Sequence, residues 1–222
     1  MATSVGAAKQ GQLEGQEALF EWVKRNRQAL YWTGGIVVFA AAIFGWKILS
    51  TRQSEQRASV ELSAGRFALE SKNYALAASE FARIAANYSG TRSADEATIL
   101  LAQVRLAQGQ SQQAISVLND FVGGAGSDYK SQAYALLGAA YENIGHAKEA
   151  ATAYEAGSRA GRLPFLQAQM LSDAGRAWLA AHDTSRAIAA YRQIMTKFDS
   201  TGSAYEAKAR LGELGDLGNP PK

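Results

Sequence analysis

The hydrophobic residues of this chain fall into two different patterns. One apolar stretch is continuous, because no charged residue occurs from Gln28 to Trp46 and the stretch extends through Lys47 to Leu49. Beyond residue 57, apolar and small residues instead recur among polar residues at a long, regular interval. The first pattern is typical of a helix in hydrocarbon, and the second is typical of a repeat protein.

The continuous stretch is long enough to cross a bilayer. Its 20 residues from Leu30 to Leu49 would span roughly 30 Å as a helix that rises about 1.5 Å per residue. Aromatic rings near each end favour the headgroup layer, where a lysine can extend its amine outward. We therefore predict a single-pass transmembrane signal-anchor helix over residues 28–49, in preference to a buried core helix or a cleaved signal peptide. Its anchoring residues are Leu30, Tyr31, Trp32, Trp46 and Lys47.

A stripe of small residues lies within this predicted span. Gly34, Ala41 and Gly45 are separated by seven and four residues, which places them on one side of a helix. Small residues allow another helix to approach closely. The stripe therefore either contacts a partner helix or reflects only the abundance of glycine and alanine in such spans.

The charges beside the span bear on its orientation. Lys24, Arg25 and Arg27 precede it, whereas Arg52 and Arg57 follow it. Because positively charged flanks tend to stay in the cytoplasm, this slight excess favours a cytoplasmic N-terminus. The C-terminal part would then lie outside the cytoplasm.

The long interval measures 36–37 residues and involves three kinds of residue. A small residue, an alanine and a bulky residue each recur four times, with steps of 37, 36 and 37 residues. The small residues are Gly65, Ala102, Gly138 and Gly175, the alanines are Ala77, Ala114, Ala150 and Ala187, and the bulky residues are Phe81, Leu118, Tyr154 and Tyr191. Three series in register indicate four copies of one unit.

These series resemble the tetratricopeptide repeat, a pair of helices with aromatic, Leu-Gly, Tyr and Ala positions at fixed offsets. The third copy carries most of the pattern, at Tyr134, Leu137, Gly138, Tyr141, Gly145, Ala150 and Tyr154. Copy two departs from it at Arg105, where a tyrosine is usual, and copy four at His182, where the turn glycine is usual. The resemblance predicts an α-solenoid of about four helix pairs, with a capping helix around Leu211-Gly212.

The residue types suit such a stack. The small residue and the alanine would lie where two helices cross, and the bulky residue would fill the space between neighbouring units. The interval exceeds the 34 residues of the usual repeat, so we expect longer loops at residues 87–90 and 123–126.

The composition supports an all-α fold, because 47% of residues are hydrophobic, many of these are alanine, and only three prolines occur. We divide the chain into a cytoplasmic tail, the span, a helical junction, the repeat domain and a flexible tail. Their boundaries are residues 1–27, 28–49, 50–57, 58–214 and 215–222.

Charge and cysteine content exclude several classes of function. Residues 50–222 hold 18 Lys/Arg and 17 Asp/Glu, so this part lacks the clustered basic face of a nucleic-acid-binding protein. The chain has no cysteine, which excludes disulfides, thiolate metal sites and cysteine nucleophiles.

The layout as a whole resembles the bacterial ancillary subunits of the Sec translocon. The resemblance rests on a short acidic-to-basic segment at residues 17–27, an anchor that begins near residue 30 and ends near Gly45-Trp46, and the repeats that follow. It extends from about residue 17 to residue 214. It implies a periplasmic repeat domain that links an inner-membrane complex to periplasmic folding factors.

Catalytic chemistry finds little support in the sequence. His146 and His182 fall at predicted turns without the carboxylate or thiol cluster of a metal site. Ser127 and Lys130 match the short Ser-x-x-Lys pattern of some acyl enzymes, but they lie in a predicted loop without the companion motifs. We expect no catalytic residue, no cofactor, no metal and no small-molecule substrate.

The first helix of each tetratricopeptide pair lines the concave face of the solenoid, so the register predicts a set of partner-binding residues. These are Arg66, Gln103, Gln132, Glu142, Asn143, Gln169 and Arg176. Each could equally be an ordinary solvated position. The Lys and Asn set that holds a partner's C-terminal carboxylate in some members of this fold is missing.

We therefore predict a membrane-anchored scaffold for protein–protein interactions, located in the bacterial inner membrane with its C-terminal domain in the periplasm. Its partners would be an integral membrane complex, a periplasmic protein or both. The first alternative is a permanent structural subunit of a respiratory, photosynthetic or secretory complex. The second is a hydrolase that uses Ser127 and Lys130.

Overall fold

The computed structural model describes residues 24–124 and 127–216, apart from some side chains between residues 29 and 41 and that of Ser127. The chain divides into two compact units, residues 1–53 and residues 54–222, and each is considered by itself. All regular secondary structure of the described residues is helical. The all-α prediction is confirmed.

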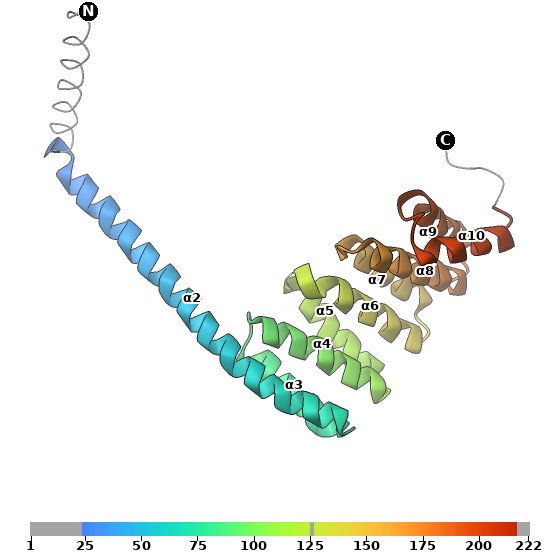
Figure 1. The fold of residues 1–222 in the computed structure, drawn as a ribbon, viewed down its shortest axis with the longest axis horizontal. Coiled ribbons are helices and arrows are strands. Elements are labelled where there is room, and N and C mark those ends of the chain that lie inside the picture. Colours follow the sequence, from blue (N-terminus) through green and yellow to red (C-terminus); the bar gives the residue numbers. More distant parts are fainter. Residues whose placement is uncertain (1–23, 125–126, 217–222) are drawn as a thin grey trace, which may run out of the picture. The chain divides into compact units, whose positions relative to one another are not determined.

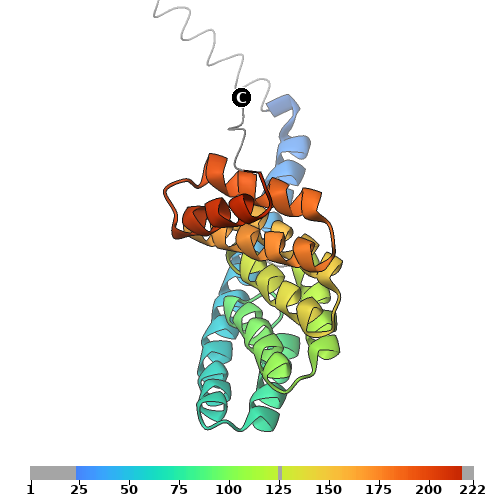
Figure 2. The same ribbon diagram turned by 90° about the vertical axis from the view of Figure 1, so that its right-hand side faces the viewer.

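The second unit is a row of helix pairs (Figures 1 and 2). Its helices are the C-terminal part of α2 (Arg27–Glu70), α3 (Tyr74–Asn87), α4 (Arg92–Ala107), α5 (Ser111–Gly124), α6 (Ser127–Asn143), α7 (Ala147–Ala160), α8 (Pro164–Ala180), α9 (Thr184–Lys197) and α10 (Gly202–Glu213). The pairs are α2 with α3, α4 with α5, α6 with α7, and α8 with α9, and α10 follows alone. We call α2, α4, α6, α8 and α10 the first helices and α3, α5, α7 and α9 the second helices.

A residue with positive φ makes the tight turn inside each pair. These residues are Lys72, Gly109, Gly145 and His182, with φ of 57°, 72°, 77° and 59°. In each turn the next backbone N–H donates to the carbonyl five residues back, as His146 does to Tyr141 and Asp183 to Trp178 (2.9 Å each), which closes the end of the first helix. The predicted turn positions of His146 and His182 are confirmed, and His182 adopts the glycine conformation despite its side chain.

The small and bulky series meet inside each pair. A Cβ added to Gly65 would lie 2.6 Å from the Phe81 ring, and one added to Gly138 would lie 2.6 Å from the Tyr154 ring. The bulky residue thus packs on the first helix of its own pair, where the two helices cross and only glycine lets an aromatic ring fit. It also shares a core with the next first helix, because Tyr154 lies in one cluster with Trp178 of α8. The expectation that this residue fills the space between units is therefore incomplete, since it leaves out the contact inside the pair.

Two local predictions are also corrected. Gly123 and Gly124 belong to α5 and do not form a loop, while residues 125–126 lie outside the described residues. Ser127 and Lys130 belong to the first turn of α6, not to a loop. At residues 87–90, α3 ends at Asn87 and a turn leads to α4 at Arg92, so the predicted connection lies there but is short.

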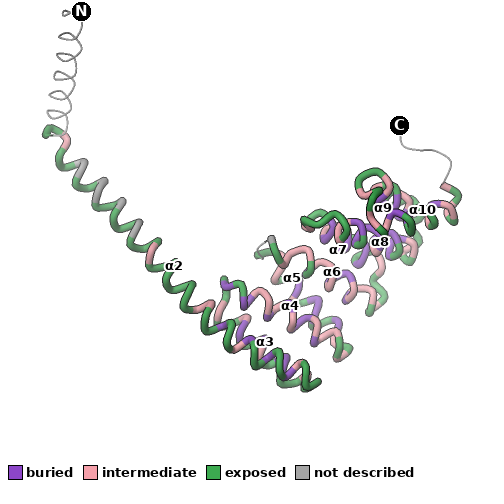
Figure 3. Tube along the Cα trace, in the orientation of Figure 1, coloured by how far each residue is buried: buried purple, intermediate pink, exposed green. Residues whose placement is uncertain are grey.

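The N-terminal part of α2 belongs to the first unit. Of the residues predicted to anchor it, Tyr31, Trp32, Trp46 and Lys47 are exposed. Figure 3 shows most of the described positions in this part of α2 in green, the colour of exposed residues. No helix that the described residues form is long and apolar enough to span a membrane. The predicted span over residues 28–49 is thus not confirmed. Leu30, Gly34 and Ala41 belong to α2, but their burial lies outside what the structure describes, while Gly45 is half-buried. Residues 50–57 are helical.

Candidate protein-binding face

The first helices of the second unit lie next to one another and form one face. Helix α4 contacts α6, and α8 contacts α10. Ion pairs bridge further neighbours, since Arg66 on α2 pairs with Glu96 on α4, and Arg176 on α8 pairs with Glu142 on α6. We call this surface, which the first helices line, the inner face.

The structure brings the seven predicted binding residues to first helices but gives them different surroundings. Gln132, Asn143 and Gln169 are exposed, and Gln103 is half-buried. Arg66, Glu142 and Arg176 instead form ion pairs with neighbouring first helices. Gln132, Asn143 and Gln169 thus remain open to a partner, whereas Arg66 and Arg176, although exposed, also join adjacent repeats.

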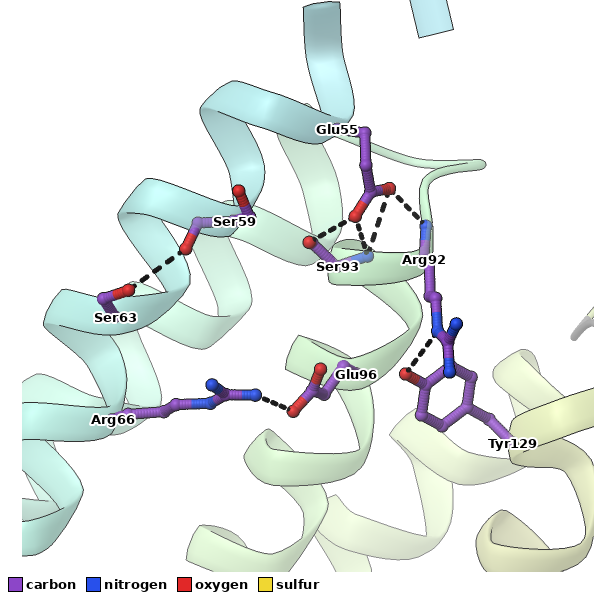
Figure 4. Close-up of polar contacts among 8 residues, drawn as sticks. All are labelled: Glu55, Ser59, Ser63, Arg66, Arg92, Ser93, Glu96 and Tyr129. Carbon is purple, nitrogen blue, oxygen red and sulfur yellow. Dashed lines mark hydrogen bonds and ion pairs between the residues drawn. The ribbon is translucent and has the colours of Figure 1, made fainter. Parts of the chain in front are cut away.

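At the N-terminal end of this face, Glu55 of α2 closes the beginning of α4 (Figure 4). Its carboxylate accepts hydrogen bonds from the backbone N–H groups of Arg92 (2.7 Å) and Ser93 (3.1 Å) and from the Ser93 hydroxyl (2.6 Å). The side chain of Arg92 in turn reaches the Tyr129 hydroxyl of α6 (3.4 Å). A negative charge beside free N–H groups is favourable at a helix N-terminus, so Glu55 fixes α4 against α2.

Replacing Glu55 with glutamine should therefore destabilise the repeat domain by about 1–2 kcal/mol, because the helix end loses a charge and one strong acceptor. Urea unfolding followed by circular dichroism would measure the change. Glu70→Gln is the matched control, since Glu70 is an exposed residue of the same helix. Equal stability of both variants would contradict the role assigned to Glu55.

A second polar cluster joins α6, α7 and α8. The Tyr154 hydroxyl donates to Glu142 (2.8 Å), and Arg176 donates to Glu142 (2.6 Å) and to Asp173 (3.1 Å). Burial, followed by the hydrogen bond to Glu142, raises the pKa of Tyr154. Burial also raises the pKa of Asp173, with added repulsion from Glu142 and Glu206 that Arg176 offsets in part. This end of the inner face therefore gathers carboxylates around one arginine.

Sequence reasoning missed Glu96 and Asp173 as members of this face. In the register of the small residues, Glu96 lies six positions before Ala102 and Asp173 two positions before Gly175. The predicted residue Gln132 stands at the first of these offsets. Applying that offset to copy two would have identified Glu96, whereas no predicted residue stands at the second offset, so the register alone gave no signal for Asp173.

The two histidines and the Ser-Lys pair were the candidates for a metal site or for catalysis. The described residues contain no group of three or more His, Asp or Glu side chains placed to hold a metal ion. His146 stacks on Tyr141 with ring centroids 6.3 Å apart and lies 3.9 Å from Glu149. The side chain of Ser127 lies outside the described residues, so the Ser-Lys hypothesis is not tested.

Paired antiparallel helices with a turn of positive φ, glycines under aromatic rings and adjacent first helices define a tetratricopeptide-like solenoid. Two solved structures share this fold. Both are of a kinesin light chain-like protein from Podosopora anserina with nearly identical TPR-like repeats, one of them a variant with a single substitution.

Each is 18% identical to this chain, and each alignment covers 73% of this chain and 92% of the other, with TM-scores of 0.53 for the variant and 0.54 for its counterpart. At this identity the likeness supports the fold alone. No protein-family model matches the chain, and no curated protein matches its sequence.

Proposed function

We propose that this protein is a scaffold that binds a protein partner on the inner face of its tetratricopeptide-like domain. The observation that carries the proposal is the row of first helices, which presents Gln132, Asn143 and Gln169 to solvent on one surface. Amide side chains both donate and accept hydrogen bonds, so this surface suits the polar groups of another polypeptide. A solenoid supplies such an extended surface without a catalytic centre.

Substitution of the open amides tests this proposal. The double variant Gln132→Lys and Gln169→Lys should lose proteins that co-purify with the full chain, because two charges replace neutral hydrogen-bonding groups. Gln112→Lys with Gln113→Lys is the matched control, since both residues are exposed on the second helix α5. Quantitative mass spectrometry of the purified material would compare the three proteins. The same set of partners on all of them would show that the inner face does not bind.

We further propose that the N-terminal part of α2 holds this scaffold at a membrane, next to a membrane-protein complex such as a secretion channel. The support is the uncharged sequence from Gln28 to Trp46 and the exposed apolar side chains within it, among them Phe39 and Phe44, which are 69% and 66% exposed. Tethering would confine the inner face to the membrane surface and raise its effective concentration near a membrane partner.

Fractionation of cells tests the tether. The full chain should stay in the membrane pellet after carbonate extraction. Phe39→Lys with Phe44→Lys should move it to the soluble fraction, because charged residues in hydrocarbon are costly. Gln53→Lys, just outside the apolar sequence, should change nothing. Extraction of the unaltered chain by carbonate would contradict the proposal.

We further propose that the repeat domain lies in the periplasm, and labelling of a single introduced cysteine tests this orientation. The chain has no cysteine of its own. Thr152 is exposed on α7, so Thr152→Cys should react with a membrane-impermeant maleimide in intact spheroplasts if the repeat domain is periplasmic. Labelling only after lysis would place that domain in the cytoplasm.

A further inference from the structure

The outer side of α2 in the second unit carries two large apolar side chains that the described residues leave uncovered. Val60 is 73% exposed and Phe67 is 70% exposed. They lie seven residues apart on one side of the helix, and the buried Ala58 and Leu62 lie on the opposite side. We call the side that carries Val60 and Phe67 the outer α2 face.

The repeat register shows what covers this face elsewhere in the row. Val60 stands five positions before the small residue of its copy, where later first helices have Ala97, Ala133, Met170 and Ala207, all buried. Phe67 stands two positions after the small residue of its copy, and the later first helices have Val104, Ala140, Ala177 and Leu214 at that position. Each later first helix packs against the second helix of the preceding pair. The outer α2 face is therefore an interface of the same kind, without its second helix.

Residue sizes across the covered interfaces obey a simple rule. Met170, the large residue of its series, contacts Gly157 of α7, where an added Cβ would lie 2.8 Å from the Met170 sulfur. At the small positions Ala97 and Ala207, the preceding second helix places an isoleucine in the same core, Ile84 or Ile194. A large residue on the first helix thus requires a small one on the helix that covers it.

We propose that the outer α2 face binds an amphipathic helix of a partner protein, antiparallel to α2 and with glycine or alanine opposite Val60. The direction follows from the second helices, which join the next first helix through short turns and lie antiparallel to it. A second copy of α2 fits poorly, because an antiparallel pair centred between residues 63 and 64 would place Val60 of each copy opposite Phe67 of the other, where the size rule requires a small residue. The proposal adds a second binding surface to the proposed scaffold.

A stapled helical peptide of residues 147–160 is the probe, because α7 is the helix that covers a large residue in this protein. Fluorescence anisotropy would measure its binding to the full chain in mild detergent. We expect the same peptide with Gly157→Ile to bind at least tenfold more weakly. Against the Val60→Ala chain the order should reverse, since that face then resembles Ala97 and Ala207.

Phe67→Asp should abolish binding of the peptide, whereas Tyr205→Asp should not, because Tyr205 is an exposed residue of α10 (83%) at the far end of the row. The Phe67→Asp chain should still co-purify with the proteins whose binding depends on Gln132 and Gln169. This result would separate the outer α2 face from the proposed function of the inner face. The proposal for the outer α2 face would be overturned if both peptides bound equally well, or if the peptide still bound to the Phe67→Asp chain. It would also be overturned if light scattering showed a dimer that Phe67→Asp dissociates, because a second copy of the chain would then be the occupant.

Discussion

Replacing Trp178 with alanine should destabilise the repeat domain by about 3–5 kcal/mol, the largest effect expected of any single substitution described above. Trp178 is 1% exposed, in the core that joins α7, α8, α9 and α10. Its indole N–H donates to Glu155 of α7 (2.7 Å), and the Arg186 guanidinium lies 4.5 Å from the ring centroid. Alanine would leave a cavity in this core, would remove the hydrogen-bond donor of Glu155 and would remove the aromatic ring that the Arg186 guanidinium contacts.

Urea unfolding of the Trp178→Ala and Trp178→Phe chains would separate these contributions. Phenylalanine keeps most of the ring volume and loses the hydrogen bond, so it should cost about 1–2 kcal/mol. A loss as large as that of alanine would mean that the bond to Glu155, and not the packing of the ring, dominates. No loss in either variant would contradict the place of Trp178 in the core.

Gly65→Ala should destabilise the domain by about 1–3 kcal/mol, because its Cβ would overlap the buried ring of Phe81. The second repeat shows how this cost can be relieved, since Ala102 there shares its core with the smaller Leu118. Adding Phe81→Leu to Gly65→Ala should therefore recover part of the stability relative to the sum of the single substitutions. Thermal unfolding of the four chains in this double-mutant cycle would measure the coupling.

Gly123→Ala is the matched control for this cycle. An added Cβ at Gly123 meets nothing within 4 Å, so alanine should leave stability unchanged or raise it by up to about 1 kcal/mol through helix propensity. Two results would contradict the packing of Gly65 against the Phe81 ring as the reason for the small residue of each repeat. These are a stability of Gly65→Ala like that of Gly123→Ala, and additive effects of Gly65→Ala and Phe81→Leu in the double variant.

The solenoid could be predicted from the sequence because its repeat is encoded at residues that touch. Gly138 and Tyr154 recur together since each fixes the size of the other, and this pairing makes the 36–37-residue period visible without any homologue. The direction of that contact could not be predicted, because spacing places both residues at a crossing of helices without saying which helices cross.

The inner face could be predicted only in part. The register assigned Gln132 and Gln169 to first helices, since it depends on helical geometry alone. It could not show that Arg66 and Arg176 pair with Glu96 and Glu142, because these pairs depend on how far neighbouring first helices are displaced. The loop predicted at Gly123 and Gly124 was wrong for another reason. Glycine has a low helix propensity, but the cost at two positions at the end of α5 is small enough for the helix to include them.

Among the described residues of the second unit, the extensive contacts join helices that are one or two places apart in the row. A pulling force on such an arrangement is transmitted from each helix pair to the next, because no single core joins all the pairs. Tension applied to one end would consequently peel away a single pair at a time, so the domain would yield in small steps and recover them in reverse. Such a domain can lengthen under load while its remaining pairs stay folded.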